Sequence, residues 1–114
     1  MTMSFNELPE FGKDCKRLGK KYLSLPDDLE LFKKVLEEVP LGTDKHFALL
    51  FQNTELKIAK ARFFCRFLKK NTLRIIYAYH FSKRQIVFIE LYFKGDQNRE
   101  DKRRIGDYIK QHSA

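Results

Sequence analysis

The stretch from Lys57 to Lys94 constrains the fold more than any other, because apolar and polar side chains alternate along most of it. β-Branched and aromatic residues are enriched in three runs, which are Lys57–Phe67, Thr72–Phe81 and Gln85–Lys94. Such enrichment with a period of two residues is typical of β-strands. Short polar breaks at 69–71 and 82–84 suit hairpin turns, so the stretch is predicted to form an antiparallel sheet.

Successive side chains on a strand point to opposite faces of a sheet. One face of the three runs is expected to be apolar, with Phe63, Cys65, Phe67, Leu73, Ile75, Tyr77, Tyr79, Val87, Ile89, Leu91 and Phe93. The other is expected to gather Arg62, Arg66, Arg74, His80, Phe88, Glu90, Tyr92 and Lys94. Because antiparallel sheets often bury one face only, the second face is interpreted as a cationic surface exposed to water.

The positive charge of the chain is concentrated in this same stretch. It holds ten Lys or Arg residues and one carboxylate, a balance of +9, whereas the whole chain of 114 residues carries +8. A local basic surface of this kind indicates a polyanionic partner.

The rest of the chain predicts helices around the sheet in a single domain spanning residues 1–114. Apolar residues at helical spacing predict a helix over 9–22 and a second that opens at Pro26 and stops before Pro40. A last helix follows residues 95–98, with Asp96 or Asn98 as its cap. Residues 4–8 suggest a short strand, and residues 47–51 fit either a strand or a helical turn. The expected fold is α+β, with a helical hairpin on a twisted antiparallel sheet of three to four strands and a C-terminal helix.

Several classes of function lack their signals in the sequence. No apolar run has the length of a membrane helix, and the N-terminus does not read as a signal peptide. Cys15 and Cys65 are interpreted as reduced thiols of a cytoplasmic protein, with a disulfide between them as the alternative. The three histidines are scattered and no glycine-rich phosphate loop is present, so neither a metal nor a nucleotide cofactor is expected.

The remaining chemistry is acid–base catalysis on a polyanion. Cleavage of RNA without a metal needs a base for the 2′-hydroxyl, cations for the charged phosphorane and an acid for the leaving 5′-oxygen. Arginine suits the second task because its planar donors bind phosphate oxygens in pairs. The candidate catalytic residues are Arg62, Arg74, Glu90, Tyr92, Lys94 and His80. The candidate RNA-binding residues are Lys57, Lys60, Arg66, Lys69 and Lys70.

Several of these candidates also have a structural interpretation. Glu90 could be the cross-strand ion-pair partner of Arg62 or Arg74. His80 could be an ordinary surface imidazole, and Tyr92 could lie in a core under the C-terminal helix. Lys69 and Lys70 could be solvated turn residues that add only nonspecific attraction to phosphate.

The chain resembles the RelE/ParE superfamily of small bacterial toxins, with HigB- and RelE-like members the most similar. The resemblance is carried by 57–62 (KIAKAR), 73–77 (LRIIY) and 89–94 (IELYFK), followed by the polar GDQNRED. It implies a helical hairpin on a twisted antiparallel sheet with a concave basic face. It also implies cleavage of mRNA without a metal, often on the ribosome, and an antitoxin partner that blocks the basic face.

Matched by position, Arg74 corresponds to the arginine that contacts the scissile phosphate in this family. Arg62, with or without Lys60, corresponds to the preceding basic strand, and Lys94 to the basic residue that ends the last strand. The family's C-terminal catalytic Tyr or His has no counterpart between Asp96 and Arg104. The resemblance therefore leaves three alternatives, which are an mRNA-cleaving toxin, a ParE-like inhibitor of DNA gyrase, and a member that binds RNA or antitoxin with little catalysis.

Overall fold

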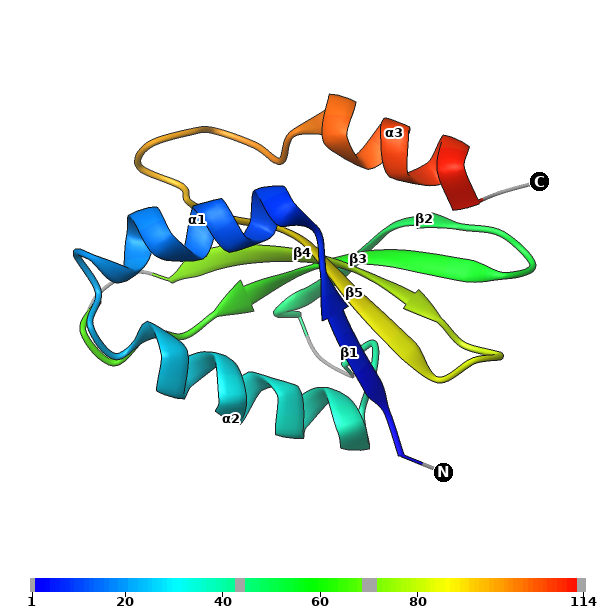
Figure 1. Cartoon of the computed structure of the whole chain (residues 1–114), viewed down its shortest axis with the longest axis horizontal. Helices are drawn as coiled ribbons and strands as arrows, with labels where there is room; N and C mark the ends of the chain where they lie inside the picture. Colours follow the sequence, from blue (N-terminus) through cyan, green and yellow to red (C-terminus); the bar gives the residue numbers. More distant parts are fainter. Residues whose placement is uncertain (1, 43–44, 69–71, 113–114) are drawn as a thin grey trace.

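The computed structural model describes residues 2–42, 45–68 and 72–112. The elements run β1 (Ser4–Glu7), α1 (Pro9–Gly19), α2 (Leu25–Glu38), β2 (Phe47–Gln52), β3 (Leu56–Phe63), β4 (Leu73–His80), β5 (Gln85–Phe93) and α3 (Lys102–His112) (Figure 1). The strands form one sheet in the order β1-β5-β4-β3-β2. All neighbouring strands are antiparallel except β1, which runs parallel to β5.

The α+β prediction is confirmed, but the sheet of three to four antiparallel strands is corrected to a mixed sheet of five. The sequence indicated only a short strand at residues 4–8 and left residues 47–51 undecided, and the structure makes both of them edge strands. Short runs of this kind carry too little periodicity to identify a strand without its neighbour.

The two N-terminal helices pack on one face of the sheet, as predicted. Proline opens the first turn of each helix, and Asp27 and Asp28 lie where the helix dipole favours negative charge. Phe11, Leu18, Leu25 and Leu36 form the core of this face together with Ala59, Ala61, Phe63, Leu73, Ile75, Tyr77, Phe88 and Leu91. Aromatic rings interlock there, since Phe32 meets both Phe63 and Tyr77 edge-on.

The opposite face is not the open wet surface that the sequence predicted. Ile105 and Tyr108 of α3 lie on it and complete a second core with Leu56, Ile58, Ile76, Ala78, Val87, Ile89 and Tyr92. Figure 1 shows α2 and α3 on opposite sides of the sheet. At the end of this face where β3 ends and β4 begins, Arg62 is exposed and Arg74 is half-buried.

A bulge in β5 changes which side chains share a face. Ile76 aligns with Glu90 and the next residue of β4, Tyr77, aligns with Phe88, so Ile89 is an extra residue. An inserted residue reverses the alternation beyond it. Phe88 therefore belongs to the helical-hairpin core, whereas Val87 and Ile89 lie on the α3 side, and the predicted facing of these three residues is wrong.

Strand β3 also ends earlier than predicted, at Phe63 rather than Phe67. Cys65 is buried as expected, but Phe67 is 57% exposed. Both cysteines are free thiols.

Candidate nucleic-acid interface

The site is built on a row of three residues that cross the sheet. Arg62 of β3 is aligned with Arg74 of β4, and Arg74 is aligned with Tyr92 of β5. Aligned residues of antiparallel strands have Cα atoms about 4.5–5.5 Å apart. We call these three residues the arginine row. Lys94, just after β5, is exposed two residues beyond Tyr92.

The arginine row places two positive charges directly opposite each other, an arrangement that costs stability in a sheet. The Arg62 side chain is exposed, whereas Arg74 is half-buried. Arg74 Nη1 donates to the carbonyl oxygen of Thr72 at 3.2 Å and to the Thr72 hydroxyl. Thr72 thus fixes the direction of the Arg74 guanidinium group, and the pair of guanidinium groups offers a ready site for a phosphate.

A second row lies one step along the strands, with Lys60 aligned with Ile76 and Ile76 aligned with Glu90. Lys60 Nζ donates to Glu100 Oε1 at 2.9 Å. Burial acts to raise the pKa of Glu100, but the hydrogen bond and charge of Lys60 bring the pKa below its ordinary value. Glu100 is therefore a carboxylate at neutral pH. The sequence analysis missed it because it lies in the irregular loop after β5.

Glu90 is buried and organises this loop. Its carboxylate accepts hydrogen bonds from Gln97 Nε2 at 2.9 Å and from the backbone N–H of Asp101 at 2.7 Å. Burial raises the pKa of Glu90 above its ordinary value, although both hydrogen bonds act in the opposite direction. Its hydrogen bonds run to the loop, whereas one interpretation of the sequence had it pair with an arginine across the strands.

Tyr92 is 2% exposed and lies within the second core. Burial, together with the charges of Glu100 and Glu90, raises the pKa of Tyr92 to about 12, while Arg74 acts in the opposite direction. The phenol is therefore protonated at neutral pH and suits proton donation better than proton abstraction.

His80 does not join this group. It lies six residues from Arg74 on β4, which at about 3.3 Å per residue is roughly 20 Å away. Its Nε2 is 2.5 Å from the hydroxyl of Tyr108, and burial followed by the charges of His112 and Lys83 lowers the pKa of His80. His80 is a buried contact of α3 in this structure rather than a surface imidazole.

The predicted RNA-binding residues are divided between several surfaces. Lys60 belongs to the site, whereas Lys57 has the opposite facing on β3 and lies 5.6 Å from the ring of Phe81. Arg66 Nε lies 3.2 Å from Asp28 Oδ1, so Arg66 pairs with the start of α2. Burial acts to raise the pKa of Asp28, but hydrogen bonds from Ser24 and Arg66 bring it below its ordinary value. Lys69 and Lys70 lie outside the described residues.

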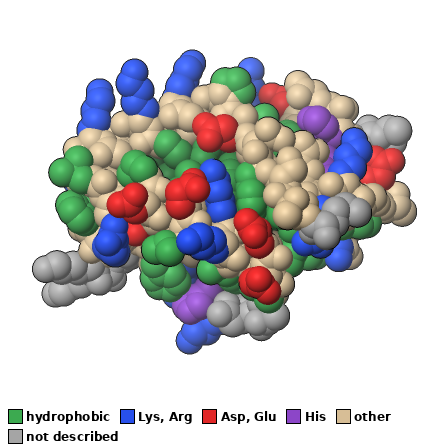
Figure 2. Space-filling model, turned by 60° about the horizontal axis from the view of Figure 1, so that its bottom comes forward, with side chains coloured by type: hydrophobic (Ala, Val, Ile, Leu, Met, Phe, Trp, Pro, Cys, Tyr) green, Lys and Arg blue, Asp and Glu red, His purple; other side chains and the backbone are tan. Residues whose placement is uncertain are grey.

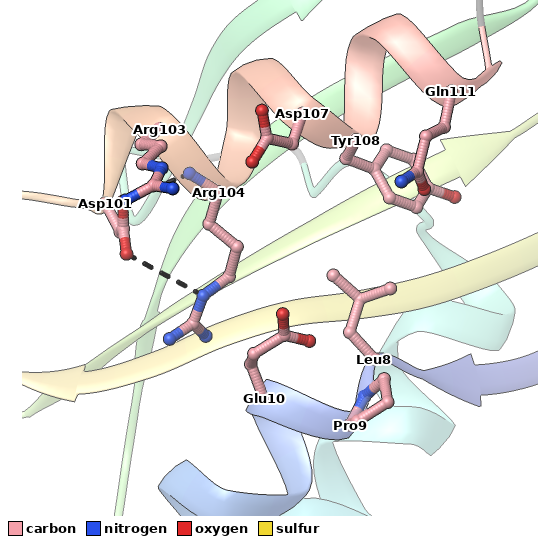
Figure 3. A pocket seen from close by; sticks show the side chains of 9 residues that line it. All are labelled: Leu8, Pro9, Glu10, Asp101, Arg103, Arg104, Asp107, Tyr108 and Gln111. Carbon is pink, nitrogen blue, oxygen red and sulfur yellow. Dashed lines mark hydrogen bonds and ion pairs between the residues drawn. The ribbon is translucent and has the colours of Figure 1, made fainter.

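Arg104 attaches α3 to both the sheet and α1. Its Nη1 lies 2.8 Å from Asp14 Oδ2 and 2.8 Å from the carbonyl oxygen of Ile89, the bulge residue. Figure 3 shows Arg104 extending from α3 toward the ribbon of β5. Asp101 Oδ1 accepts the backbone N–H of Arg104 at 3.1 Å, so Asp101 caps the helix in place of the predicted Asp96 or Asn98.

The loop, β5 and α1 line a cavity beside the arginine row that is open to solvent on one side. Its volume is about 450 Å³, and its lining includes Glu90, Tyr92, Gln97 and Arg104. The side of the molecule formed by α2 differs from the site, because acidic, basic and hydrophobic side chains are intermixed over it (Figure 2). That helix exposes Asp27, Glu30, Glu37 and Glu38, so the α2 side offers no uniform positive field.

No group of three or more His, Cys, Asp or Glu side chains in residues 2–42, 45–68 and 72–112 is arranged to hold a metal ion. None of the helices in these ranges combines the length and hydrophobicity that a membrane crossing requires.

Comparisons with known proteins identify the fold. No protein-family model and no curated sequence matches the chain. Among solved structures, RelE in the archaeal RelE–RelB complex from Pyrococcus horikoshii OT3 superposes with a TM-score of 0.61 at 21% identity, covering 83% of this chain and 98% of that one. The E. coli toxin RelE in the free state, as a mutant with two arginines replaced by alanine, superposes with a TM-score of 0.59 at 13% identity. This match covers 98% of this chain and 99% of that one. This chain therefore has the RelE fold, as the resemblance in its sequence implied.

Proposed function

We propose that this chain, which has the fold of the RelE toxins, is the toxin of a toxin–antitoxin module and cleaves mRNA in the cytoplasm without a metal ion. The observation that supports this most strongly is the arginine row, in which Arg62 and Arg74 stand directly opposite each other. A sheet gains no stability from two opposed cations, and a bound phosphate would offset their repulsion. The complex of the archaeal RelE with RelB supports a cognate antitoxin as the protein partner.

In the proposed reaction, the 2′-hydroxyl of the RNA attacks the adjoining phosphorus and the bond to the 5′-oxygen breaks. Arg74 and Arg62 stabilise the negative charge that builds on the phosphorane oxygens, which is the term that contributes most in such reactions. Lys94 positions a phosphate from the edge of the site. Tyr92, protonated at neutral pH, donates a proton to the leaving oxygen, and Glu90 holds the proton that the attacking hydroxyl releases.

Controlled expression in bacteria tests this proposal. Wild-type protein is expected to arrest growth and translation, and Arg74→Ala to relieve the arrest, because truncation removes the fixed guanidinium group. Lys57→Ala is the matched control, since it removes one positive charge from the other face of the sheet. Equal toxicity of wild type and Arg74→Ala would remove Arg74 from the mechanism.

Two assays with purified protein separate this activity from its rival. In the first assay, we expect the protein to cleave mRNA when ribosomes are present. In the second, we expect DNA gyrase to supercoil DNA normally when the protein is added. Inhibited supercoiling with intact mRNA would reject the ribonuclease and favour the gyrase inhibitor.

A further inference from the structure

The contact between Lys60 and Glu100 joins two distant parts of the chain within the site. Lys60 Nζ and Glu100 Oε1 are 2.9 Å apart, and the two side chains are 31% and 13% exposed. The loop that carries Glu100 is held on both sides of that residue, because Gln97 and the backbone of Asp101 both donate to the buried Glu90. The carboxylate is thus held over Lys60 rather than meeting it by chance at the surface.

We propose that Glu100 occupies a phosphate site on Lys60 in the free protein, and that a phosphate of single-stranded RNA displaces it on binding. This inference rests on the proposed function. A carboxylate and a phosphate oxygen accept from an ammonium group at the same distance, about 2.7–2.9 Å, so each can replace the other on Lys60.

The position of Lys60 fits a phosphate next to the scissile one. Lys60 and Arg62 share a face of β3 two residues apart, which is about 6.6 Å along the strand. That separation is comparable to the distance between neighbouring phosphates of an extended strand. RNA whose scissile phosphate lies on the arginine row would therefore bring its next phosphate toward Lys60.

The charge of Glu100 also reaches the arginine row. The Glu100 carboxylate adds to the effect of burial in raising the pKa of Tyr92, and Arg74 opposes it. When a phosphate takes the place of Glu100 on Lys60, Lys60 stays paired with a negative group and the Glu100 carboxylate moves away from Lys60. Glu100 therefore links the phosphate site on Lys60 to Tyr92 of the arginine row.

Binding of a fluorescent 2′-O-methyl oligoribonucleotide tests the proposal without cleavage, because this probe lacks the attacking hydroxyl. Glu100→Gln in the full chain is expected to bind the probe about three to ten times more tightly than wild type, since the amide holds Lys60 less strongly. The matched control is Asp107→Asn, which removes the same charge from an exposed position on α3. It is expected to change affinity less than twofold.

A double-mutant cycle isolates the contact itself. Lys60→Ala is expected to weaken probe binding several-fold more in the Glu100→Gln background than in wild type, because in wild type the RNA must first break the contact between Lys60 and Glu100. The slope of log affinity against log salt should be similar in wild type and Glu100→Gln, because Lys60 contacts phosphate in both complexes, and should be shallower by about 0.7 when Lys60 is replaced by Ala. Thermal unfolding checks that each variant folds, and Glu100→Asp, which keeps the charge on a shorter side chain, should fall between wild type and Glu100→Gln.

These measurements distinguish failure of the Glu100 proposal from failure of the proposed toxin function. Equal affinity of Glu100→Gln and Asp107→Asn, or an equal cost of Lys60→Ala in both backgrounds, would overturn the masking by Glu100 and leave the toxin proposal intact. Failure of folded wild type and folded Glu100→Gln alike to bind the probe would count against both.

Discussion

The pair formed by Arg104 and Asp14 should be one of the strongest polar contributions to the stability of this protein. Its atoms are 2.8 Å apart and the side chains are 18% and 7% exposed. It is the point at which α3, α1 and the β5 bulge meet, because Asp14 also accepts the backbone N–H of Leu91 and Arg104 also donates to Ile89. We predict that Arg104→Met will loosen α3 and destabilise the whole fold.

The size of the expected loss of unfolding free energy follows from the contacts that the remaining side chains keep. Removing one partner of a buried ion pair costs about 3–5 kcal/mol. Here Asp14 keeps the N–H of Leu91 and a contact with Arg17 at 3.5 Å, and water reaches part of Arg104. The expected loss for Arg104→Met is therefore about 2–3 kcal/mol, or a fall in Tm of roughly 10 °C for a chain of this size.

Urea unfolding of four proteins measures the pair. Wild type, Arg104→Met, Asp14→Asn and the double variant form a cycle, in which asparagine still accepts the N–H of Leu91. We expect a coupling free energy of at least about 1 kcal/mol between the two positions. Arg103→Met, an exposed neighbour on α3, is the control and should change stability by less than about 0.5 kcal/mol.

Two results would refute this reasoning. One is a loss of unfolding free energy in Arg104→Met that is no larger than the loss in the control, Arg103→Met. The other is additivity of the two single variants with unchanged m-values, because independent effects would mean that the charges do not act on each other.

The remaining predictions concern Glu90 and Arg62. Folded Glu90 binds its proton more tightly than an unfolded glutamate, so the unfolding free energy of wild type falls as pH rises between the two pKa values. The difference in unfolding free energy between Glu90→Gln and wild type should therefore shift in favour of the variant as pH rises from about 4 to about 7, and a constant difference in urea titrations across this range would contradict it. Arg62→Gln should increase stability by about 0.5 kcal/mol, because it relieves the repulsion from Arg74, while it reduces toxicity. A thermal melt and the growth assay measure both effects, and a loss of stability would show that Arg62 is held by the fold rather than kept for a ligand.

Local pattern was enough to predict the helices and the central strands. The alternation of polar and apolar residues along β3 and β4 placed Arg62 and Arg74 on one face, and the register of the strands confirms that placement. Both residues lie on strands without a break in register between them, which is why a period of two sufficed.

The sequence pattern did not predict the structure where one extra residue sets the facing of a strand or where a contact joins distant segments of the chain. The bulge at Ile89 reverses the facing of β5, and no alternation rule identifies which residue is the extra one. Glu100 meets Lys60, and Arg66 meets Asp28, only because loops bring together residues about forty positions apart. The position of α3 over the second face likewise depends on Arg104 and Asp14, a contact between the two ends of the chain.

The parallel pairing of β1 with β5 has a consequence for biosynthesis. Ser4 emerges from the ribosome long before Gln85, its neighbour in the sheet. Closing so large a loop is entropically costly, and contacts that are distant along the chain form slowly. The arginine row also needs Tyr92 of the same late strand. A newly made molecule therefore passes through an interval in which α1 and α2 can exist but the arginine row cannot, and that row is completed only after β5 has been translated.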